Sequence, residues 1–155
     1  MFTRVLIAEG FESSNLSVQR ALEDLKIPNP KYVSYCDDAI SRIKMGIQEN
    51  DPFELLITDL SFEEDHRQQI IKNGQELISA AKTIQPDLKV IVFSVNKKQS
   101  ITDNLFEKQQ INGYVRKARE DVKDLKKAIN KVKNGVNNFE YIPLFSRLAR
   151  SCRIS

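Results

Sequence analysis

Apolar and polar residues follow two alternating patterns along the chain. Continuous apolar runs, typical of strands buried on both faces of a parallel sheet, occur at 4–8, 32–35, 55–58, 89–93 and 113–115. Between them, apolar residues recur every three or four positions, which predicts helices over 13–25, 37–49, 74–85, 100–108 and 122–132. Strict alternation of strand and helix favours an α/β fold whose parallel sheet carries helices on both faces.

Polar residues and glycines mark where these elements begin and end. Ser13 or Ser14 is the expected cap of the first helix, and Gly135 ends the last one. A polar stretch at 63–73 interrupts the alternation before the third helix. The segment from 140 onward is amphipathic and predicts an additional helix or the start of a linker.

The apolar run at 55–58 stops at a carboxylate, Asp59. The carboxyl ends of parallel strands share one edge of the sheet, where open α/β folds place their sites. Four polar residues at the ends of predicted strands are expected to lie at this edge: Glu9, Asp59, Ser94 and Lys117. A carboxylate can attack a phosphoryl donor to give an acyl phosphate, and a divalent metal, a lysine and a hydroxyl stabilise the transferred charge. The set therefore suits reversible phosphorylation of a carboxylate.

Each of these residues also has a purely structural interpretation. Asp59 is a residue type that caps a strand end, Lys117 alone is a surface lysine, and Ser94 suits a turn. Glu9 is placed either to help bind a metal or only to neutralise Lys117. The order and strand-end placement of the four residues, rather than any one of them, favour the site.

Length and charge set further limits. The chain has 155 residues, enough for one domain, and its net charge of +3 is too small to indicate nucleic-acid binding by itself. Residues 114–155 hold eleven Lys or Arg against four Asp or Glu, which is typical of a solvated helix face or of a surface for a partner or a nucleic acid.

The sequence shows no membrane-spanning run and no signal peptide, so we expect no membrane contact and a cytoplasmic location.

Five segments resemble the receiver domain of bacterial response regulators, in the helix-turn-helix subfamily (LuxR/NarL-like) that includes the capsule-synthesis regulator type. They are VLIAE at 5–9, LITDLS at 56–61, GQELI at 74–78, VIVFS at 90–94 and GYVRK at 113–117. The resemblance covers about residues 3–135. It implies a flavodoxin-like, doubly wound sheet of five parallel strands in the order 2-1-3-4-5, with helices on both faces. It also implies a receiver domain over 1–136 and, over 137–155, a C-terminal helix or linker toward an effector domain absent from this chain.

The resemblance also implies a role for each site residue. Asp59 corresponds to the phosphoacceptor, Lys117 to the lysine that pairs with the phosphoryl group, and Ser94 to the hydroxyl that signals its presence. Tyr114 corresponds to the aromatic switch residue that swings inward on activation. Glu9 corresponds to the first of two acidic residues that hold Mg²⁺.

Magnesium is the cofactor that the resemblance implies, held by Glu9, Asp59 and the backbone carbonyl of Ser61. The second acidic position of the family is Gly10 here, so one metal ligand is missing and we expect Mg²⁺ binding to be weakened or lost.

Other residues near the site bear on this expectation. Three acids, Glu12, Glu63 and Glu64, are candidates to replace the missing ligand. Val95 stands where the family usually has a small residue, and we expect its bulk to crowd the phosphoryl site.

The sequence therefore predicts a non-enzymatic receiver that accepts a phosphoryl group on Asp59 from a histidine kinase and switches dimerisation or a DNA-binding output. The expected form is a homodimer, with DNA bound only through a C-terminal domain not present in this chain. Gly10 and Val95 favour an alternative, a degenerate receiver that acts as a phosphorylation-independent interaction or dimerisation module. An aspartate-dependent phosphatase is a more distant alternative, because such enzymes usually need a second acid where this chain has Ser61.

Overall fold

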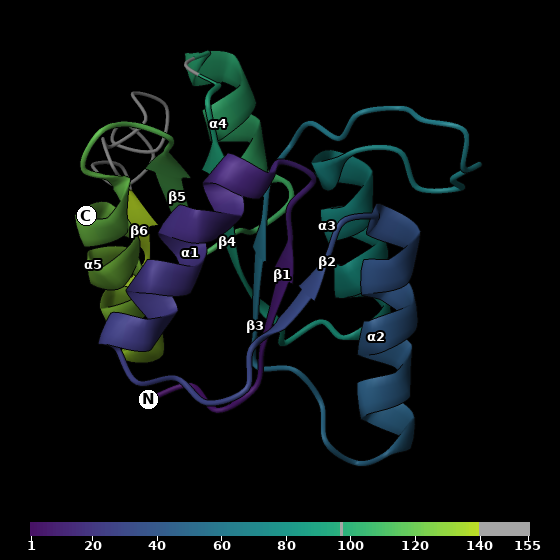
Figure 1. Ribbon diagram of the computed structural model, residues 1–155, viewed down its shortest axis with the longest axis horizontal. Helices are drawn as coiled ribbons and strands as arrows, with labels where there is room; N and C mark the ends of the chain where they lie inside the picture. The colour runs from purple at the N-terminus through teal and green to yellow at the C-terminus, as the bar shows by residue number, and fades with distance from the viewer. Residues whose placement is uncertain (97, 140–155) are drawn as a thin grey trace, which may run out of the picture.

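One parallel sheet forms the centre of the molecule (Figure 1). The computed structural model describes residues 1–96 and 98–139. The strands are β1 (Val5–Ala8), β2 (Lys31–Val33), β3 (Leu55–Thr58), β4 (Lys89–Ser94), β5 (Gly113–Arg116) and β6 (Asn138–Phe139). Their order is β2-β1-β3-β4-β5-β6, so the predicted order 2-1-3-4-5 is confirmed and is extended by one strand.

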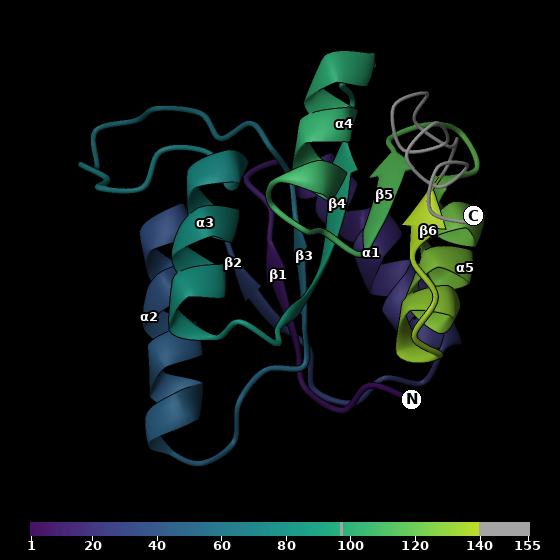
Figure 2. The same cartoon turned by 180° about the vertical axis from the view of Figure 1, so that it is seen from behind.

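Helices cover both faces of this sheet, as predicted (Figures 1 and 2). They are α1 (Glu12–Asp24), α2 (Cys36–Gln48), α3 (Gly74–Ile84), α4 (Gln99–Glu107) and α5 (Asp121–Lys133). Helices α1 and α5 lie side by side on one face, and α2 and α3 lie together on the other. Within the described ranges, no helix has the length and apolar content needed to cross a membrane.

Alternate residues of each central strand serve opposite layers of the core. In β1, Val5 and Ile7 pack with α1 and α5, whereas Leu6 and Ala8 pack with α2 and α3. Every residue of β1 and β3 is buried. This two-sided burial explains why continuous apolar runs, rather than alternating ones, mark the strands of this chain.

The start of α1 differs from the prediction. Its N-cap is Phe11, with no capping side chain, and Ser13 and Ser14 lie inside the helix, so the predicted serine cap is wrong. The chain turns directly from β1 into the helix, and the carboxylate of Glu9 accepts the N–H of Phe11 at 3.1 Å. A carboxylate from the preceding strand end thus bonds the backbone where α1 begins. The helix starts at Glu12, so Ser13 and Ser14 are already helical residues and cannot be its N-cap.

The C-terminal part of the sheet also differs from the prediction. A helix or linker was expected over 137–155, but Asn138–Phe139 form β6, which pairs with β5 in parallel. The physical reason is that β5 would otherwise end the sheet, with one row of backbone groups unpaired. Residues 140–155, on which the rest of that prediction falls, lie outside the described residues.

Candidate functional site

The four predicted site residues lie at the carboxyl edge of the sheet, at or just beyond the ends of four strands. Glu9 follows β1, Asp59 follows β3, Ser94 ends β4 and Lys117 follows β5. Glu9, Asp59 and Ser94 are 2%, 3% and 1% exposed. The register pairs Ala8 with Thr58 and Thr58 with Val92, so Glu9 and Asp59 follow at the same level of the sheet and Ser94 lies one residue beyond that level.

Lys117 joins the two carboxylates of the site. Its Nζ lies 2.6 Å from Oδ2 of Asp59 and 3.2 Å from Oε1 of Glu9. The rings of Phe11 and Phe93 flank the ammonium, with centroids 5.2 Å and 5.5 Å from Nζ. The sequence predicts both phenylalanines only as core residues, because an aromatic residue beside a strand end is equally typical of a core. Their rings add a favourable cation–π contribution and limit the access of water to the charged groups.

The second oxygen of Asp59 is held by the backbone that follows it. Its Oδ1 accepts the N–H of Leu60 at 2.6 Å and the N–H of Ser61 at 3.4 Å. Helix α3 begins directly against this loop, since the N–H of Gly74 donates to the carbonyl of Leu60 at 2.9 Å. A Cβ at Gly74 would lie only 2.0 Å from the carbonyl oxygen of Asp59. Glycine is therefore required at 74 for the loop to hold Asp59 in this position.

Two buried carboxylates share a single lysine in this site. Burial, and after it the negative charge of Asp59, raises the pKa of Glu9 from 4.5 to about 7, against the opposing effect of Lys117. Near neutral pH Glu9 is therefore present in both protonated and ionised forms.

Ser94 and Tyr114 are connected through the loop after β4. The Oγ of Ser94 accepts the N–H of Asn96 at 3.2 Å, and the carbonyl of Asn96 accepts the hydroxyl of Tyr114 at 2.6 Å. Tyr114 is 1% exposed, so its ring lies inside the fold. The backbone N–H of Lys117 donates to the carbonyl of Ser94 at 2.9 Å, which fixes the two strand ends relative to each other.

No family model and no curated protein matches the sequence. The isolated REC domain of RcsB from Salmonella enterica serovar Typhimurium, in the presence of phosphomimetic BeF3⁻, matches with TM-score 0.71 and 22% identity over 90% of this chain and 94% of that chain. A LuxR-family two-component response regulator from Aurantimonas sp. SI85-9A1 matches with TM-score 0.69 and 13% identity over 100% of both chains.

The chain has the fold of a response-regulator receiver domain. A longer RcsB response regulator from Salmonella typhimurium, described for its conformational dynamism in DNA interaction, matches with TM-score 0.72 and 23% identity. That match covers 94% of this chain and 65% of the other. The chain thus spans slightly less than two thirds of that regulator.

The receiver fold of this chain carries a donor set that suits Mg²⁺ only in part. Glu9 and Asp59 offer the carboxylate oxygens that Mg²⁺ prefers. In the described residues, however, no three His, Cys, Asp or Glu side chains form a group that could hold a metal. Glu12, Glu63 and Glu64 are exposed, and none completes such a group. That one of them replaces the missing acid stays a prediction.

Gly10 and Val95, the two residues that depart from the family pattern, have different surroundings. A Cβ at Gly10 would meet the ring of Phe62 at 3.6 Å and the carbonyl of Ser34 at 3.8 Å, which are ordinary contacts. The backbone therefore does not demand glycine there. Val95 is 65% exposed, and the expectation that its bulk crowds a phosphoryl group stays a prediction. It directly follows Ser94, the last residue of β4, at a bend of the chain.

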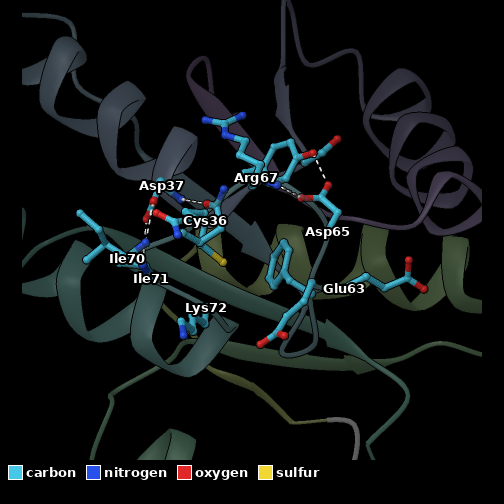
Figure 3. Close-up of a pocket in the computed structure, with 14 residues that line it drawn as sticks. Cys36, Asp37, Glu63, Asp65, Arg67, Ile70, Ile71 and Lys72 are labelled. Atoms are coloured by element: carbon cyan, nitrogen blue, oxygen red, sulfur yellow. Dashed lines mark hydrogen bonds between the residues drawn. The ribbon is translucent and has the colours of Figure 1, made fainter.

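The receiver fold also carries a cavity of about 530 Å³ that the sequence did not indicate, between the start of α2 and the loop from β3 to α3 (Figure 3). The carboxylate of Asp37 accepts the N–H groups of Ile70 and Ile71, both at 2.8 Å. The guanidinium of Arg67 lies 4.2 Å from the ring centroid of Tyr35. These contacts hold the loop onto α2.

Proposed function

We propose that this chain is a receiver that accepts a phosphoryl group on Asp59 in two-component signal transduction. The observation that carries the proposal is the buried contact between Lys117 and the carboxylate of Asp59, with Nζ 2.6 Å from Oδ2. This contact lies at the carboxyl edge of a receiver fold, where Lys117 also contacts Glu9 and where the buried Ser94 ends β4. Phosphoryl transfer depends mainly on such positioning and on charge stabilisation.

In the proposed reaction an oxygen of Asp59 attacks the phosphorus of a phosphohistidine on a histidine kinase. The P–N bond breaks, the imidazole keeps its electron pair, and Asp59 becomes an acyl phosphate. Lys117 neutralises the charge of the phosphoryl oxygens, because its ammonium already lies beside the attacking carboxylate. The hydroxyl of Ser94 donates to one of these oxygens, which reports the phosphoryl group to the loop after β4.

Magnesium has a minor place in this proposal. Glu9, Asp59 and the backbone carbonyl of Ser61 are the groups that would bind it, and bound Mg²⁺ would neutralise negative charge at the phosphoryl group. Because Gly10 stands at the second acidic position of the family, one carboxylate ligand is missing. We therefore assign charge neutralisation first to Lys117 and expect Mg²⁺ to bind weakly.

A degenerate receiver is the alternative with an observation of its own. Lys117 contacts both carboxylates, so the charges of the site are already largely paired without a metal or a phosphoryl group. A site of this kind can serve as a structural ion-pair network in a phosphorylation-independent interaction module. Within residues 1–96 and 98–139 no third acid joins Glu9 and Asp59 in a group that could hold a metal, which supports this alternative as well.

The proposed output is a change of the α4–β5–α5 surface, coupled to Ser94 through Tyr114, that alters dimerisation. DNA binding enters the proposal only through a C-terminal domain outside this chain, by analogy with the longer RcsB regulator described for its DNA interaction.

Intact-protein mass after incubation with acetyl phosphate tests the proposal. We expect one phosphoryl adduct on the wild-type chain and none on Asp59→Asn. Gly10→Asp is the matched gain-of-function variant, because a Cβ at 10 makes only ordinary contacts. It should increase both the adduct yield and the Mg²⁺ affinity measured by titration.

The pattern of adducts separates the two candidate functions. An adduct on the wild type that depends on Asp59 supports the phosphoryl receiver. An adduct only on Gly10→Asp supports the degenerate receiver, with a site that is correctly built but lacks its metal ligand. No adduct on either protein contradicts the phosphoryl-acceptor role of Asp59.

A further inference from the structure

The chain segment that joins β3 to α3 encloses a cavity against the start of α2 (Figure 3). Its volume of about 530 Å³ lies in the range of sites that bury a small molecule or the side chains of a partner. The segment is fixed to α2 by the two backbone N–H groups that donate to Asp37 and by the ion pair of Arg67 with Asp38. The walls of the cavity are therefore in place before any ligand enters it.

One side of this cavity already binds a guanidinium group. Two nitrogens of Arg67 donate to the two carboxylate oxygens of Asp38, at 3.0 Å and 2.5 Å, and the guanidinium lies 4.2 Å from the ring centroid of Tyr35. The hydroxyl of Tyr35 donates to Asp65 at 2.5 Å, which holds the ring in place. A carboxylate that accepts two bonds, beside an aromatic face, is an arrangement by which proteins recognise arginine. The Arg67 of this chain thus shows which chemical group this part of the surface accepts.

The other charges of the cavity favour a positively charged ligand. Its lining includes four acids, Asp37, Glu63, Glu64 and Asp65, against two bases, Arg67 and Lys72. The net charge of the lining is therefore −2. Glu63 and Glu64 are exposed and form no hydrogen bond or ion pair with the residues of 1–96 and 98–139, so their carboxylates are open to a cation.

The cavity also offers apolar surface. Phe62 and Ile71 line it and are partly buried against the core. The side chain of arginine combines a charged head with an apolar stem, which can cover such a surface while the head pairs with carboxylates. The lining therefore suits arginine better than a compact, strongly hydrated inorganic cation.

The side-chain amide of Gln69 distinguishes a peptide from a simple organic cation. Its Oε1 accepts the N–H of Asp37 at 3.4 Å, but its Nε2 is buried and has no hydrogen-bond partner among the described residues. A buried donor without an acceptor lowers stability, so a ligand that brings an oxygen to this wall gains from the pairing. A peptide segment brings backbone carbonyls, whereas an amine or a guanidine brings no acceptor.

We propose that this cavity is a docking site for an extended peptide segment of a partner protein that carries an arginine. The guanidinium pairs with Glu63 and Glu64, and a backbone carbonyl of the segment accepts the N–H of Gln69. The cavity lies on the α2 side of the molecule, away from α5 and β6 (Figure 1). A partner bound here leaves α5 and β6 uncovered, and the inference does not depend on phosphorylation of Asp59.

NMR spectra of the isotope-labelled full chain test the site with a short model peptide. The probe is acetyl-Ala-Ala-Arg-Ala-Ala-amide, and its matched control carries citrulline, which has nearly the shape of arginine but no charge. We expect the arginine peptide, at millimolar concentration, to shift the amide signals of 35–38 and 62–72, and the citrulline peptide to shift them much less. Equal shifts with both peptides, or no shift with the arginine peptide, overturn the proposal.

Variants of the two free acids locate the guanidinium. Glu63→Gln combined with Glu64→Gln removes both charges from exposed side chains and should weaken binding of the arginine peptide by about tenfold. Glu49→Gln, which changes an exposed acid at the other end of α2, is the control and should leave binding unchanged. If the double variant binds the peptide as tightly as the wild type, these acids do not hold the guanidinium and the proposed site is refuted.

Propylguanidinium, which is the arginine side chain alone, separates a peptide partner from a free organic cation. Gln69→Met should lower the affinity for the arginine peptide about fivefold, through the loss of one hydrogen bond, and leave the affinity for propylguanidinium unchanged. If propylguanidinium binds the wild type as tightly as the peptide does, and Gln69→Met affects neither ligand, the cavity takes a free cation and the peptide partner is refuted.

Discussion

Two clusters of charged side chains lie along the chain segment that joins β3 to α3. At its start, Glu9, Asp59 and Lys117 form ion pairs with side chains 2%, 4% and 12% exposed. In its middle, Arg67 pairs with Asp38, and these side chains are 42% and 38% exposed. Both clusters pair a cation with carboxylates, a lysine in the first and an arginine in the second, and their burial differs strongly.

Burial decides what each cluster does. In the buried cluster, desolvation and repulsion between two carboxylates shift the pKa of Glu9 and make Lys117 indispensable as counter-ion. In the exposed cluster, water screens the charges, so Arg67 positions the loop at little gain or loss of stability. An ion pair thus indicates a reactive site only when its surroundings prevent water from screening it.

Removal of the buried counter-ion should have the largest effect. Lys117→Met leaves two buried carboxylates without their cation, and we expect the free energy of unfolding at pH 7 to fall by about 3 kcal/mol. Urea denaturation measures this. Lys126→Met is the control, because Lys126 and its partner Asp24 are 35% and 46% exposed, and it should change stability by less than about 1 kcal/mol. Equal losses in both variants would show that burial does not separate the two kinds of pair.

The close packing of α3 against the Asp59 loop should have the next largest effect. Gly74→Ala places a Cβ 2.0 Å from the carbonyl oxygen of Asp59, so the loop must move, at a cost of about 2 kcal/mol. Gly10→Ala makes only ordinary contacts and should stay within about 0.5 kcal/mol of the wild type. Thermal unfolding compares the two. The prediction fails if Gly74→Ala is as stable as Gly10→Ala.

The shifted pKa of Glu9 predicts a dependence of stability on pH. Below pH 4.5 Glu9 is protonated in both the folded and the unfolded chain. Between pH 4.5 and about 7 only the unfolded chain ionises, so the folded state loses on the order of 2 kcal/mol of relative stability as the pH rises. Urea denaturation in EDTA should show this loss in the wild type, relative to Glu9→Gln, whose side chain does not titrate. Parallel pH profiles for the two proteins would contradict the shift.

The sequence was sufficient for the fold because two-sided burial leaves an unambiguous pattern. The apolar run at 55–58 became β3, and the helix predicted at 37–49 became Cys36–Gln48. Once the strands are known, the topology alone places Asp59 and Lys117 at one edge. The placement of the candidate site therefore follows from strand ends, without any knowledge of side-chain contacts.

What the sequence missed depends on contacts between distant segments. The pKa of Glu9 depends on how deeply the ends of β1 and β3 are buried together. The exposure of the Val95 side chain depends on where β4 ends. The described part of β6, Asn138–Phe139, is too short for a periodic pattern, and this strand pairs with the available edge of β5. The anchoring of the 63–73 loop by Asp37 joins segments more than thirty residues apart.

The exposed cluster should show the smallest effect. Arg67→Met removes the ion pair with Asp38 and the contact with the ring of Tyr35, yet all these groups face water. We expect no measurable change in the urea midpoint, because an exposed pair is screened and its side chains regain rotamer freedom when it is lost. Hydrogen exchange should instead increase locally at 63–69, while Ile70 and Ile71 remain protected by the carboxylate of Asp37. A fall in the midpoint comparable to that of Lys117→Met would mean that the loop supports the fold as strongly as the buried cluster does.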